Sequence, residues 1–434
     1  MKEWNEVPFA GLLVESRDGE WGKGKPEVGH SEAVVIRGTD FSGVNNPSQN
    51  LPHRWIKNHL IERKKLRPGD IVFEMAGGTS TQSTGRSALL RPGFFDRNAP
   101  LPAICASFSR HLRLDTSRFS PEFVYYLLQS LHRSGYMGVF HIQHTGVARF
   151  QYSSFKKHTV LNIPELPAQR KIAAILTAYD DLIEVNKCRI ALLEKMAEEL
   201  YREWFVRMRF PGHQNTRFVK GVPKGWVETQ LGKIAKFTMG QSPKSEFYNE
   251  SGDGLPFHQG VGTYGERFPN TVTYCSVDGR RASKGDILFS VRAPVGRLNI
   301  ADREMIIGRG LAAIRHNEGK NVYLYYLLKT VFSQEDIIGN GAIFNSVGKD
   351  ELSRFAVYGH PEVLIDQFEE VAGHIDNQID CLIRSTRFLT KTRDLLLPRL
   401  ISGKLSVEDL DIQFPPSMQK GMLETETQPE SSHA

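Results

Sequence analysis

Two long stretches of the chain carry apolar residues at the three- and four-residue spacing of one helix face. The first runs from Pro167 to about Arg207 without glycine or internal proline, and the second from Glu362 to about Ser402. This spacing predicts two amphipathic helices, each with one buried stripe. The positions expected in the stripes are Ile172, Ile175, Tyr179, Leu182, Asn186, Ile190, Leu193, Ala197, Leu200 and Trp204, then Phe368, Val371, Ile375, Ile379, Leu382, Leu389 and Leu396.

Each predicted helix has about 41 residues and would be roughly 60 Å long. That is longer than a neighbouring domain of about 150 residues usually needs, so we expect the helices to pair as an antiparallel coiled coil. Paired in this way, they would hold the domains that precede them at opposite ends. The alternative is that each helix packs on its own domain. Gly373 and Pro398 interrupt the second pattern.

The segments before the two helices have a different pattern. Short β-type runs such as DIVF, AICASF, DILFSV and AAIRH are separated by glycine, proline and polar residues. The stretches PEFVYYLLQSL and NVYLYYLLKTVF each predict one helix. Each segment is therefore expected to form a compact domain of mixed α and β structure.

The chain also repeats itself. Trp4 matches Trp226, Asp70 matches Asp286, and Leu193 matches Leu389, each within similar local sequence. The spacing between matched residues falls from 222 at the tryptophans to 196 at the leucines. A period near 200 is too long for a solenoid, so we predict an α+β fold with two duplicated domains and two long helices. The expected division is 1–163 and 218–360 for the domains, 164–210 and 361–410 for the helices, and 411–434 for a polar, disordered tail.

Composition narrows the class of protein. Fifty-five basic and 49 acidic residues give a formal charge of +6, which favours a polyanionic partner. The mean hydropathy is −0.35, and neither a transmembrane run nor a signal peptide is expected. The four cysteines are far apart and form no CxxC pair, so we predict neither disulfides nor a zinc site, and a reducing cytoplasm fits best.

Motifs for catalysis are missing from the sequence. It has no Asn/Asp-Pro-Pro-aromatic segment of a DNA methyltransferase and no Walker A motif for ATP. Gly260 to Gly265 matches G-x-G-x-x-G, but without a clear strand and helix around it, so a turn is expected. His141 and His144 are read as loop residues rather than metal ligands. We therefore predict no catalytic residue and no metal.

Polar and basic side chains gather in loops punctuated by glycine and proline, where they could reach DNA. Arginine, lysine, serine and threonine contact phosphates, and arginine, lysine, asparagine and glutamine read base edges. For any single residue, a solvated surface side chain remains the alternative. The candidates are Thr79, Ser80, Thr81, Gln82, Arg86, Arg149 and Gln151 in the first domain, and Gln241, Ser242, Lys244, Arg292, Arg297 and Arg309 in the second.

Several of these segments resemble the specificity subunits of Type I restriction-modification systems. The resemblance covers residues 1 to about 410; in the first domain VFEMAGGTSTQSTGRSALL departs from the VRAPVG pattern. The stretches that carry it are MGQSPKSEFY (239–248), GDILFSVRAPVGRLNIADREMIIGRGLAAIR (285–315), LPAQRKIAAILTAYDDLI, EELYREWFV and TRDLLLPRLISGKL (392–405).

The resemblance implies two target-recognition domains that each read half of a bipartite DNA site. It further implies that the helices bind two modification subunits, that restriction subunits join them, and that S-adenosylmethionine, ATP and magnesium act on these partners. This chain would then hold no cofactor and be no enzyme. Two alternatives stay open: a self-contained DNA methyltransferase or restriction enzyme with duplicated domains, and a coiled-coil scaffold without a role in DNA binding. The missing motifs count against the first, and the basic loops against the second.

Overall fold

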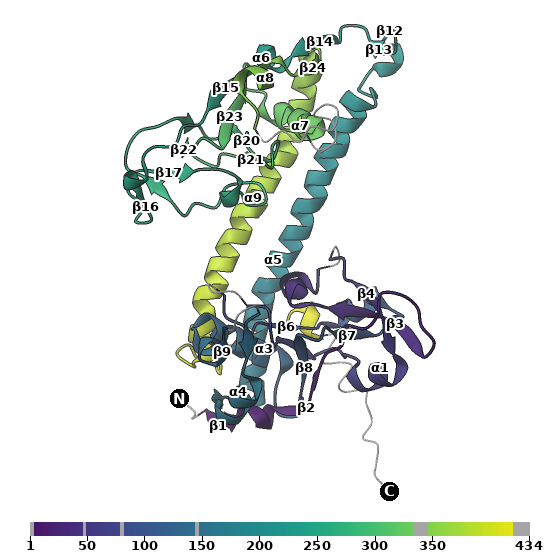
Figure 1. The fold of residues 1–434 in the computed structure, drawn as a ribbon, viewed down its shortest axis with the longest axis vertical. Helices are drawn as coiled ribbons and strands as arrows, with labels where there is room; N and C mark the ends of the chain where they lie inside the picture. Colours follow the sequence, from purple (N-terminus) through teal and green to yellow (C-terminus); the bar gives the residue numbers. More distant parts are fainter. Residues whose placement is uncertain (1–3, 47–48, 79–81, 144–146, 333–345, 420–434) are drawn as a thin grey trace. The chain divides into compact units, whose positions relative to one another are not determined.

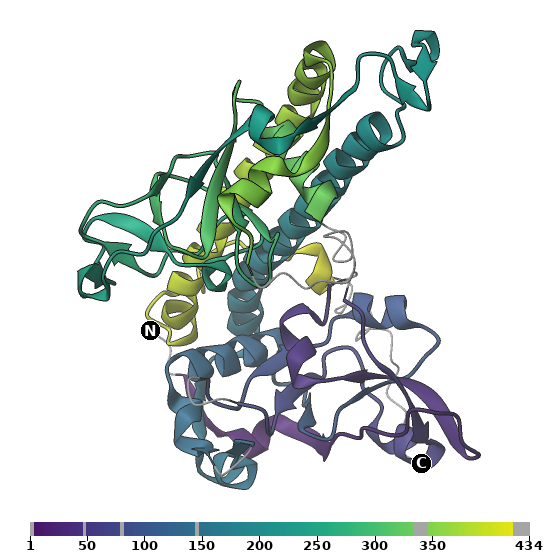
Figure 2. The same cartoon turned by 45° about the horizontal axis from the view of Figure 1, so that its top comes forward.

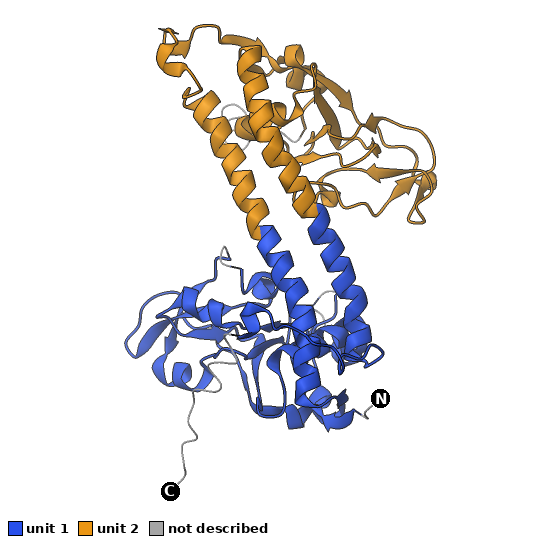
Figure 3. Ribbon diagram, turned by 180° about the vertical axis from the view of Figure 1, so that it is seen from behind, with its two compact units in different colours: residues 1–187, 384–434 blue, residues 188–383 orange. Residues whose placement is uncertain are grey.

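The computed structural model describes residues 4–46, 49–78, 82–143, 147–332 and 346–419. The chain divides into two compact units, which Figure 3 shows in different colours. Unit 1 comprises residues 1–187 and 384–434, and unit 2 comprises residues 188–383. Both long helices are present, α5 (Leu166–Tyr201) and α9 (Glu362–Ile401) (Figure 1), and each contributes residues to both units (Figure 3).

Unit 1 is built on a sheet with the order β2-β8-β5-β6. Helix α3 packs on one face of it, with Phe123 and Leu128 in the same core as Phe73 and Leu112 of the strands. The remaining strands pair as β4-β3-β7, β1-β11 and β10-β9. The bounds are β1 Asn5–Pro8, β2 Leu13–Asp18, β3 His30–Ile36, β4 His53–Lys57, α1 Asn58–Lys64, β5 Ile71–Glu74, β6 Ser87–Leu89, α2 Pro92–Asn98, β7 Ala103–Cys105, β8 Ser109–Leu114, α3 Pro121–Arg133, β9 His141–Ile142, β10 Arg149–Phe150, α4 Tyr152–His158 and β11 Val160–Ile163.

Unit 2 has a sheet with the order β15-β23-β20-β21, on which helix α7 packs through Leu324 and Leu328. A second sheet has the order β16-β18-β17-β22-β19, and β14-β24 and β12-β13 form pairs. The bounds are β12 Phe218–Val219, β13 Val222–Pro223, β14 Val227–Gln230, α6 Leu231–Ile234, β15 Ala235–Met239, β16 Tyr248–Asn249, β17 Leu255–His258, β18 Tyr274–Cys275, β19 Arg281–Ala282, β20 Ile287–Ser290, β21 Leu298–Ile300, β22 Met305–Ile307, β23 Leu311–His316, α7 Asn321–Phe332, α8 Lys349–Arg354 and β24 Ala356–Gly359.

The two units share one topology, and this confirms the duplicated fold. Strand β5 lies between β8 and β6 in unit 1, just as β20 lies between β23 and β21 in unit 2, always antiparallel. One parallel pair recurs as well, β3 with β7 and β17 with β22. The helices predicted from the repeated tyrosine-leucine segments are α3 and α7.

Within each unit, α5 and α9 pack side by side and antiparallel (Figures 1 and 2). In unit 1 the start of α5 shares a core with the end of α9, through Ile172 and Leu400. In unit 2 the end of α5 shares a core with the start of α9, through Tyr201 and Phe368, whose rings are 5.6 Å apart. A short π-helical turn, Arg202–Val206, continues α5. The two predicted long helices are thus confirmed.

Two predicted stripe positions are wrong by one residue. Leu182 is 52% exposed, whereas Ile183 is buried; Val371 is 45% exposed, whereas Ala372 is fully buried. In both helices the buried stripe advances by four residues where three were expected. The steps run from Tyr179 to Ile183 in α5 and from Phe368 to Ala372 in α9. The apolar neighbours permitted either phase, and the packing decides between them.

The start of the predicted disordered tail is ordered. Lys171 donates from its ammonium to the carbonyls of Glu408 and Leu410, at 2.7 and 2.8 Å. The hydroxyl of Ser417 donates to Asp181 at 2.6 Å, and the side chain of Met418 is buried in the core of unit 1. Residues 411–419 thus follow a segment bonded to α5 and are held by the burial of Met418 and by the bond from Ser417 to α5, while residues 420–434 lie outside the described part of the chain.

One buried and one partly buried histidine of unit 2, His258 and His360, should make its stability depend on pH. Burial lowers the pKa of His258 to about 4 and that of His360 to about 3. His258 contacts the Thr263 hydroxyl at 2.9 Å, and His360 contacts the Tyr323 hydroxyl at 2.6 Å while packing on Trp226. Both rings are therefore neutral in the folded chain at neutral pH.

Because the unfolded rings would bind a proton near pH 6.5, the free energy of unfolding should fall as the pH drops below that value. Each histidine contributes up to about 1.4 kcal/mol per pH unit, until the pH reaches its folded pKa. Urea unfolding at pH 7 and pH 5 measures the loss. His360→Phe should lose visibly less between these two pH values than the wild type; an equal loss in both chains would contradict the assignment.

Candidate nucleic-acid interface

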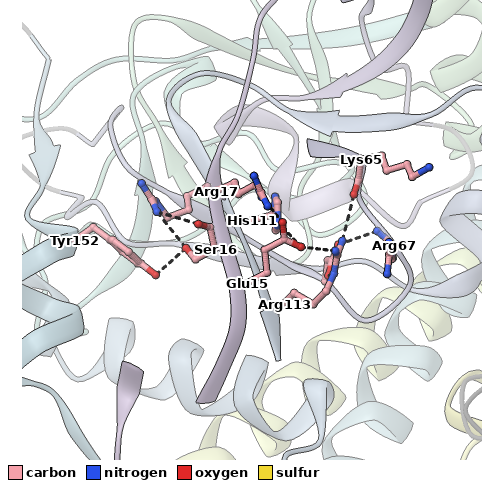
Figure 4. A network of polar contacts seen from close by, with 10 residues as sticks. Glu15, Ser16, Arg17, Lys65, Arg67, His111, Arg113 and Tyr152 are labelled. Atoms are coloured by element: carbon pink, nitrogen blue, oxygen red, sulfur yellow. Dashed lines mark hydrogen bonds and ion pairs between the residues drawn. The ribbon is translucent and has the colours of Figure 1, made fainter. Parts of the chain in front are cut away.

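The Gly-Asp motif of the first domain forms a braced turn before β5. The carboxylate of Asp70 accepts a bond from the backbone N–H of Arg67 at 2.8 Å and from the guanidinium of Arg113 at 2.7 Å. Arg113 also donates to Glu15 at 2.6 Å and to the carbonyl of Lys65 at 3.2 Å (Figure 4). Burial acts to lower the pKa of Arg113, but its bonds to the carboxylates outweigh burial and raise it. The guanidinium of Arg113 is therefore engaged by partners within the protein.

The second Gly-Asp motif repeats the arrangement. Asp286 accepts from the backbone N–H of Ser283 at 2.7 Å and from the guanidinium of Arg315. In unit 1, Arg110 also has partners inside the protein, since its guanidinium lies 4.5 Å from the ring centroid of Tyr152. The repeated motif therefore has a structural role. It holds the start of the strand whose far end carries the candidate loops.

Three residues predicted for DNA meet at one turn of unit 2. The backbone N–H of Gln241 donates to the carbonyl of Ile307 at 3.0 Å. The hydroxyl of Ser242 accepts from the backbone N–H of Arg309 at 3.1 Å and donates to the side chain of Gln259 at 2.8 Å. Ser242 thus fixes the backbone of the turn and leaves the exposed guanidinium of Arg309 to face outward.

Arg292 and Arg297 lie beside this turn, at the end of β20. The backbone N–H of Val291 donates to the carbonyl of Gly310 at 3.0 Å, which joins the end of β20 to the Arg309 turn. The hydroxyl of Ser290 accepts from the backbone N–H of Arg297 at 2.8 Å. Both arginines are exposed. Four basic or amide side chains predicted for the second domain are therefore brought to one edge of its sheet, at Gln241, Arg292, Arg297 and Arg309.

The same edge recurs in unit 1 with the same backbone bonds. After β5, the backbone N–H of Phe150 donates to the carbonyl of Met75 at 2.8 Å. After β20, the backbone N–H of Val347 donates to the carbonyl of Val291 at 2.9 Å. In each unit, a segment from shortly before the end of the predicted domain is thereby fastened to the strand that follows the Gly-Asp turn.

An arginine occupies this junction in both units. In unit 1 it belongs to the later segment, and in unit 2 it belongs to the segment that follows the strand. In unit 1 an antiparallel bridge joins Ala76 to Arg149, and in unit 2 the equivalent bridge joins Arg292 to Ser346. Within the described residues, the side chains of Arg149, Arg292 and Arg309 take part in no ion pair. Exposed cations without a carboxylate partner are suited to bind an external anion.

Other candidates are engaged within the protein. Arg86 forms an ion pair with the buried carboxylate of Glu74, with 3.0 Å between its Nε and that carboxylate. The bond to Glu74 raises the pKa of Arg86. Lys244 is highly exposed, and its ammonium lies 3.7 Å from Glu246. The ion pair with Glu74 therefore fixes Arg86 within the protein, whereas Lys244 lies on a solvent-exposed turn.

The remaining candidates of the first domain are placed as follows. Gln82 is exposed, and Gln151 is exposed at the residue that precedes α4. Thr79, Ser80 and Thr81 lie outside the described residues. The junction around Arg149 is thus the part of the first predicted site that the structure defines.

Two residues that the sequence did not single out belong to these edges. Gln259 holds Ser242 and, through its carbonyl, the backbone N–H of Gly310 at 3.1 Å. Phe108 is 62% exposed, and its carbonyl accepts from the backbone of Ala76 at 3.2 Å, beside the Arg149 bridge. An aromatic residue between two serines at a turn between strands was the available signal for Phe108.

The glycine-rich stretch at Gly260 and the histidine His141 both lie in positions that a structural role explains. Gly260 is in an extended conformation before a short 3-10 helix, Val261–Thr263, within a loop. His141 accepts a bond at its Nδ1 from the backbone N–H of Thr84 at 3.1 Å. No set of histidine, cysteine and carboxylate side chains among the described residues is arranged to hold a metal ion. None of the described helices is long and apolar enough to cross a membrane.

Comparison with known proteins finds relatives among type I restriction specificity subunits. Residues 223–358 match the model of the Type I restriction modification DNA specificity domain. The chain is 29% identical over 366 residues to the "Putative type I restriction enzyme MjaX specificity subunit" of Methanocaldococcus jannaschii, covering 81% of this chain and 82% of that protein. It is 27% identical over 309 residues to the MjaIX specificity subunit of the same organism, covering 67% and 70%.

A solved structure shows the same fold over nearly the whole chain. The crystal structure of the Type-I restriction-modification system S subunit from M. genitalium superposes with a TM-score of 0.57 at 17% identity, covering 92% of this chain and 96% of that one. The names of the relatives confirm the prediction of a specificity subunit rather than an enzyme. The chain is thus similar, over 81% of its length, to a specificity subunit of a type I restriction enzyme, and its second domain matches the family's DNA specificity domain.

Proposed function

We propose that this subunit reads a bipartite DNA target, with one half-site for each of its duplicated domains. The observation that carries the proposal is the recurrence of one edge in both units. In each, the strand after the Gly-Asp turn ends at a bridge that holds an exposed arginine, Arg149 or Arg292. Rigid backbone around an exposed arginine is what phosphate or base-edge contact requires.

The long helices are proposed to recruit the modification subunits. Each unit exposes large apolar side chains on them: Leu182, Val185, Phe388 and Leu395 in unit 1, and Leu192, Met196, Val363 and Val371 in unit 2. On α5, the spacings of three, seven and four residues place these side chains on one face. An exposed apolar helix face is typical of a protein interface. Restriction subunits would then join, with S-adenosylmethionine, ATP and magnesium bound by the partners.

Exchange of one domain tests the bipartite target. Replacing residues 218–360 with the matching domain of a relative should change one half-site and leave the other half-site unchanged, because each domain has its own sheet and its own candidate edge. Mapping the methylated sites of the reconstituted enzyme measures both half-sites at once. A change in both half-sites, or in neither, would show that the domains do not read separately.

Single substitutions at the candidate edge should separate base contacts from phosphate contacts. If Arg292 or Arg297 contacts a base, its replacement by alanine should cost about 1–3 kcal/mol at one position of the target. If the contact is to a phosphate, binding to every sequence should weaken. The slope of the logarithm of the binding constant against the logarithm of the salt concentration should then decrease in magnitude by about one. The measurement is binding of the reconstituted enzyme to DNA over a range of salt concentrations.

Lys244→Ala is the matched control for these variants. It removes an exposed cation from a loop of the same domain, but one that lies beside Glu246. We expect little change in binding for this control. Wild-type binding by both Arg292→Ala and Arg297→Ala would remove this edge from the DNA interface.

A further inference from the structure

One arginine of the second predicted domain is inserted among the helices of unit 2. Tyr264 and Pro269 form a bridge that closes a tight loop, and Arg267 lies within this loop. The side chain of Arg267 is 1% exposed. A buried guanidinium requires carboxylate or hydrogen-bond partners, since an unpaired charge in the interior is strongly unfavourable.

The partners of Arg267 come from three different helices. Its guanidinium forms an ion pair with Asp376 of α9 and lies 3.4 Å from the carboxylate of Glu194 of α5. The guanidinium carbon lies 5.0 Å from the ring centroid of Tyr325 of α7, within the range of a cation–π contact. One side chain therefore fastens the loop to both long helices and to the helix that covers the sheet.

The Arg267 loop is also fastened to the candidate DNA edge of the same domain. The backbone N–H of Ile300 in β21 donates to the carbonyl of Arg267 at 2.9 Å. The side chain of Asn299 donates to the carbonyl of Gly265 at 3.1 Å. Eight residues before Arg267, Gln259 bonds to Ser242 at the Arg309 turn. Movement of this loop on the helices would therefore move the residues proposed to meet DNA.

Unit 1 contains a similar connection made from a different element. Arg91, which precedes α2, forms an ion pair with Asp181 of α5. The hydroxyl of Tyr126 in α3 donates to Asp180 at 2.7 Å, and Arg393 of α9 pairs with the same carboxylate. In both units an arginine of the predicted domain thus meets an acidic residue of a long helix beside a tyrosine.

Buried ion pairs of this kind contribute little net stability, because desolvation of the two charges offsets their attraction. Their best-attested effect is to select one packing arrangement over others of similar energy. Apolar surfaces alone allow a domain to shift on a helix pair at small cost, whereas a displaced Arg267 would lose Asp376, Glu194 and Tyr325 together.

We propose that Arg267 is a positioning residue that sets how the second target-recognition domain sits on its helices, and thereby which spacer length between the half-sites the enzyme accepts. This inference rests on the proposed reading of a bipartite target. It assigns Arg267 no contact with DNA, since its side chain is buried. Its effect would pass through the loop to the edge that carries Arg292 and Arg309.

The test replaces the ion pair with apolar side chains in the full subunit, assembled with its modification subunit. Arg267→Met with Asp376→Leu removes both charges of this ion pair, and it leaves Glu194, whose side chain is 30% exposed, accessible to water. Methylation rates are measured on DNA targets that share both half-sites but have spacers of the natural length, one base pair shorter and one longer. We expect the preference for the natural spacer to fall by about tenfold or more, since displacements near 1 Å have effects of this size.

Three further measurements make the outcome decisive. Thermal unfolding should give a midpoint close to the wild-type value, and binding to each half-site alone should be retained. Arg281→Met is the control, because Arg281 pairs with Asp278 and Glu304 on the exposed surface of the same domain; its spacer preference should equal that of the wild type. Should the double variant not fold, Arg267→Lys keeps the charge but loses the forked geometry, and a weakened spacer preference is again expected.

An unchanged spacer preference in a folded variant would overturn the proposal for Arg267 while leaving the reading of two half-sites intact. If the wild-type enzyme itself ignored the spacer or one half-site, the proposed function would fail instead. The methylation rates of the wild-type enzyme in the same experiment therefore distinguish these two failures.

Discussion

Purified alone, this subunit should transfer no methyl group to DNA, even with S-adenosylmethionine, ATP and magnesium present. The sequence contains no Asn/Asp-Pro-Pro-aromatic segment that would hold a target base. Its one G-x-G-x-x-G stretch, Gly260 to Gly265, follows strand β17 but contains only a short 3-10 helix, Val261–Thr263, instead of opening an α-helix. It therefore lacks the helix N-terminus that binds a nucleotide phosphate. Addition of the cognate modification subunit should bring DNA adenine methylation from the background to full turnover.

Incorporation of labelled methyl groups, followed by mapping of the modified base, measures this difference. Methylation by the isolated subunit, after removal of all modification subunit, would refute the assignment of a non-catalytic role. The apolar face of α5 offers a second variant: Leu192→Asp with Met196→Asp should abolish the stimulation by preventing assembly, since both side chains are exposed on one face. Lys195→Asp, on the same turn but without loss of an apolar side chain, should assemble normally.

Much of the fold could be predicted because its signals are local and repeated. Helices α5 and α9 follow from periodicity, and the shared topology follows from the repeat around Asp70 and Asp286. The phase of the stripe could not be fixed where Leu182 precedes Ile183 or Val371 precedes Ala372. Both members of each pair are apolar, so only contacts with the other helix decide which one is buried.

The candidate site was predictable only in part, for a related reason. Glycine and proline indicated which loops carry exposed arginines, but the bridge between Arg292 and Ser346 joins residues 54 positions apart. Nothing local distinguishes Arg267, which is buried, from Arg292, which is exposed. Likewise, the ordered start of the tail depends on Met418 finding the core of unit 1, which its polar neighbours in the sequence concealed.

Lengthening both long helices should lengthen the spacer between the half-sites without changing either half-site. Four residues added to a helix extend it by roughly 6 Å and turn it by about 40° beyond a full turn. DNA rises about 3.4 Å per base pair, so the added length corresponds to nearly two base pairs. Insertion after Asn186 in α5, with a matched insertion after Leu382 in α9, would leave the packing inside each unit nearly intact, because the units divide at 187 and 383.

Methylated-site mapping of the reconstituted enzyme would give the new spacer directly. A seven-residue insertion at the same two positions is the informative companion, since it adds roughly 10 Å but returns each helix almost to its original phase. It should therefore accept a spacer about three base pairs longer than that of the wild type. Insertion into α5 alone would shift Ile190 and Ala197 against α9 and should prevent folding of the pair. An unchanged spacer in a folded, active double insertion would mean that the two domains are held on DNA by contacts other than these helices.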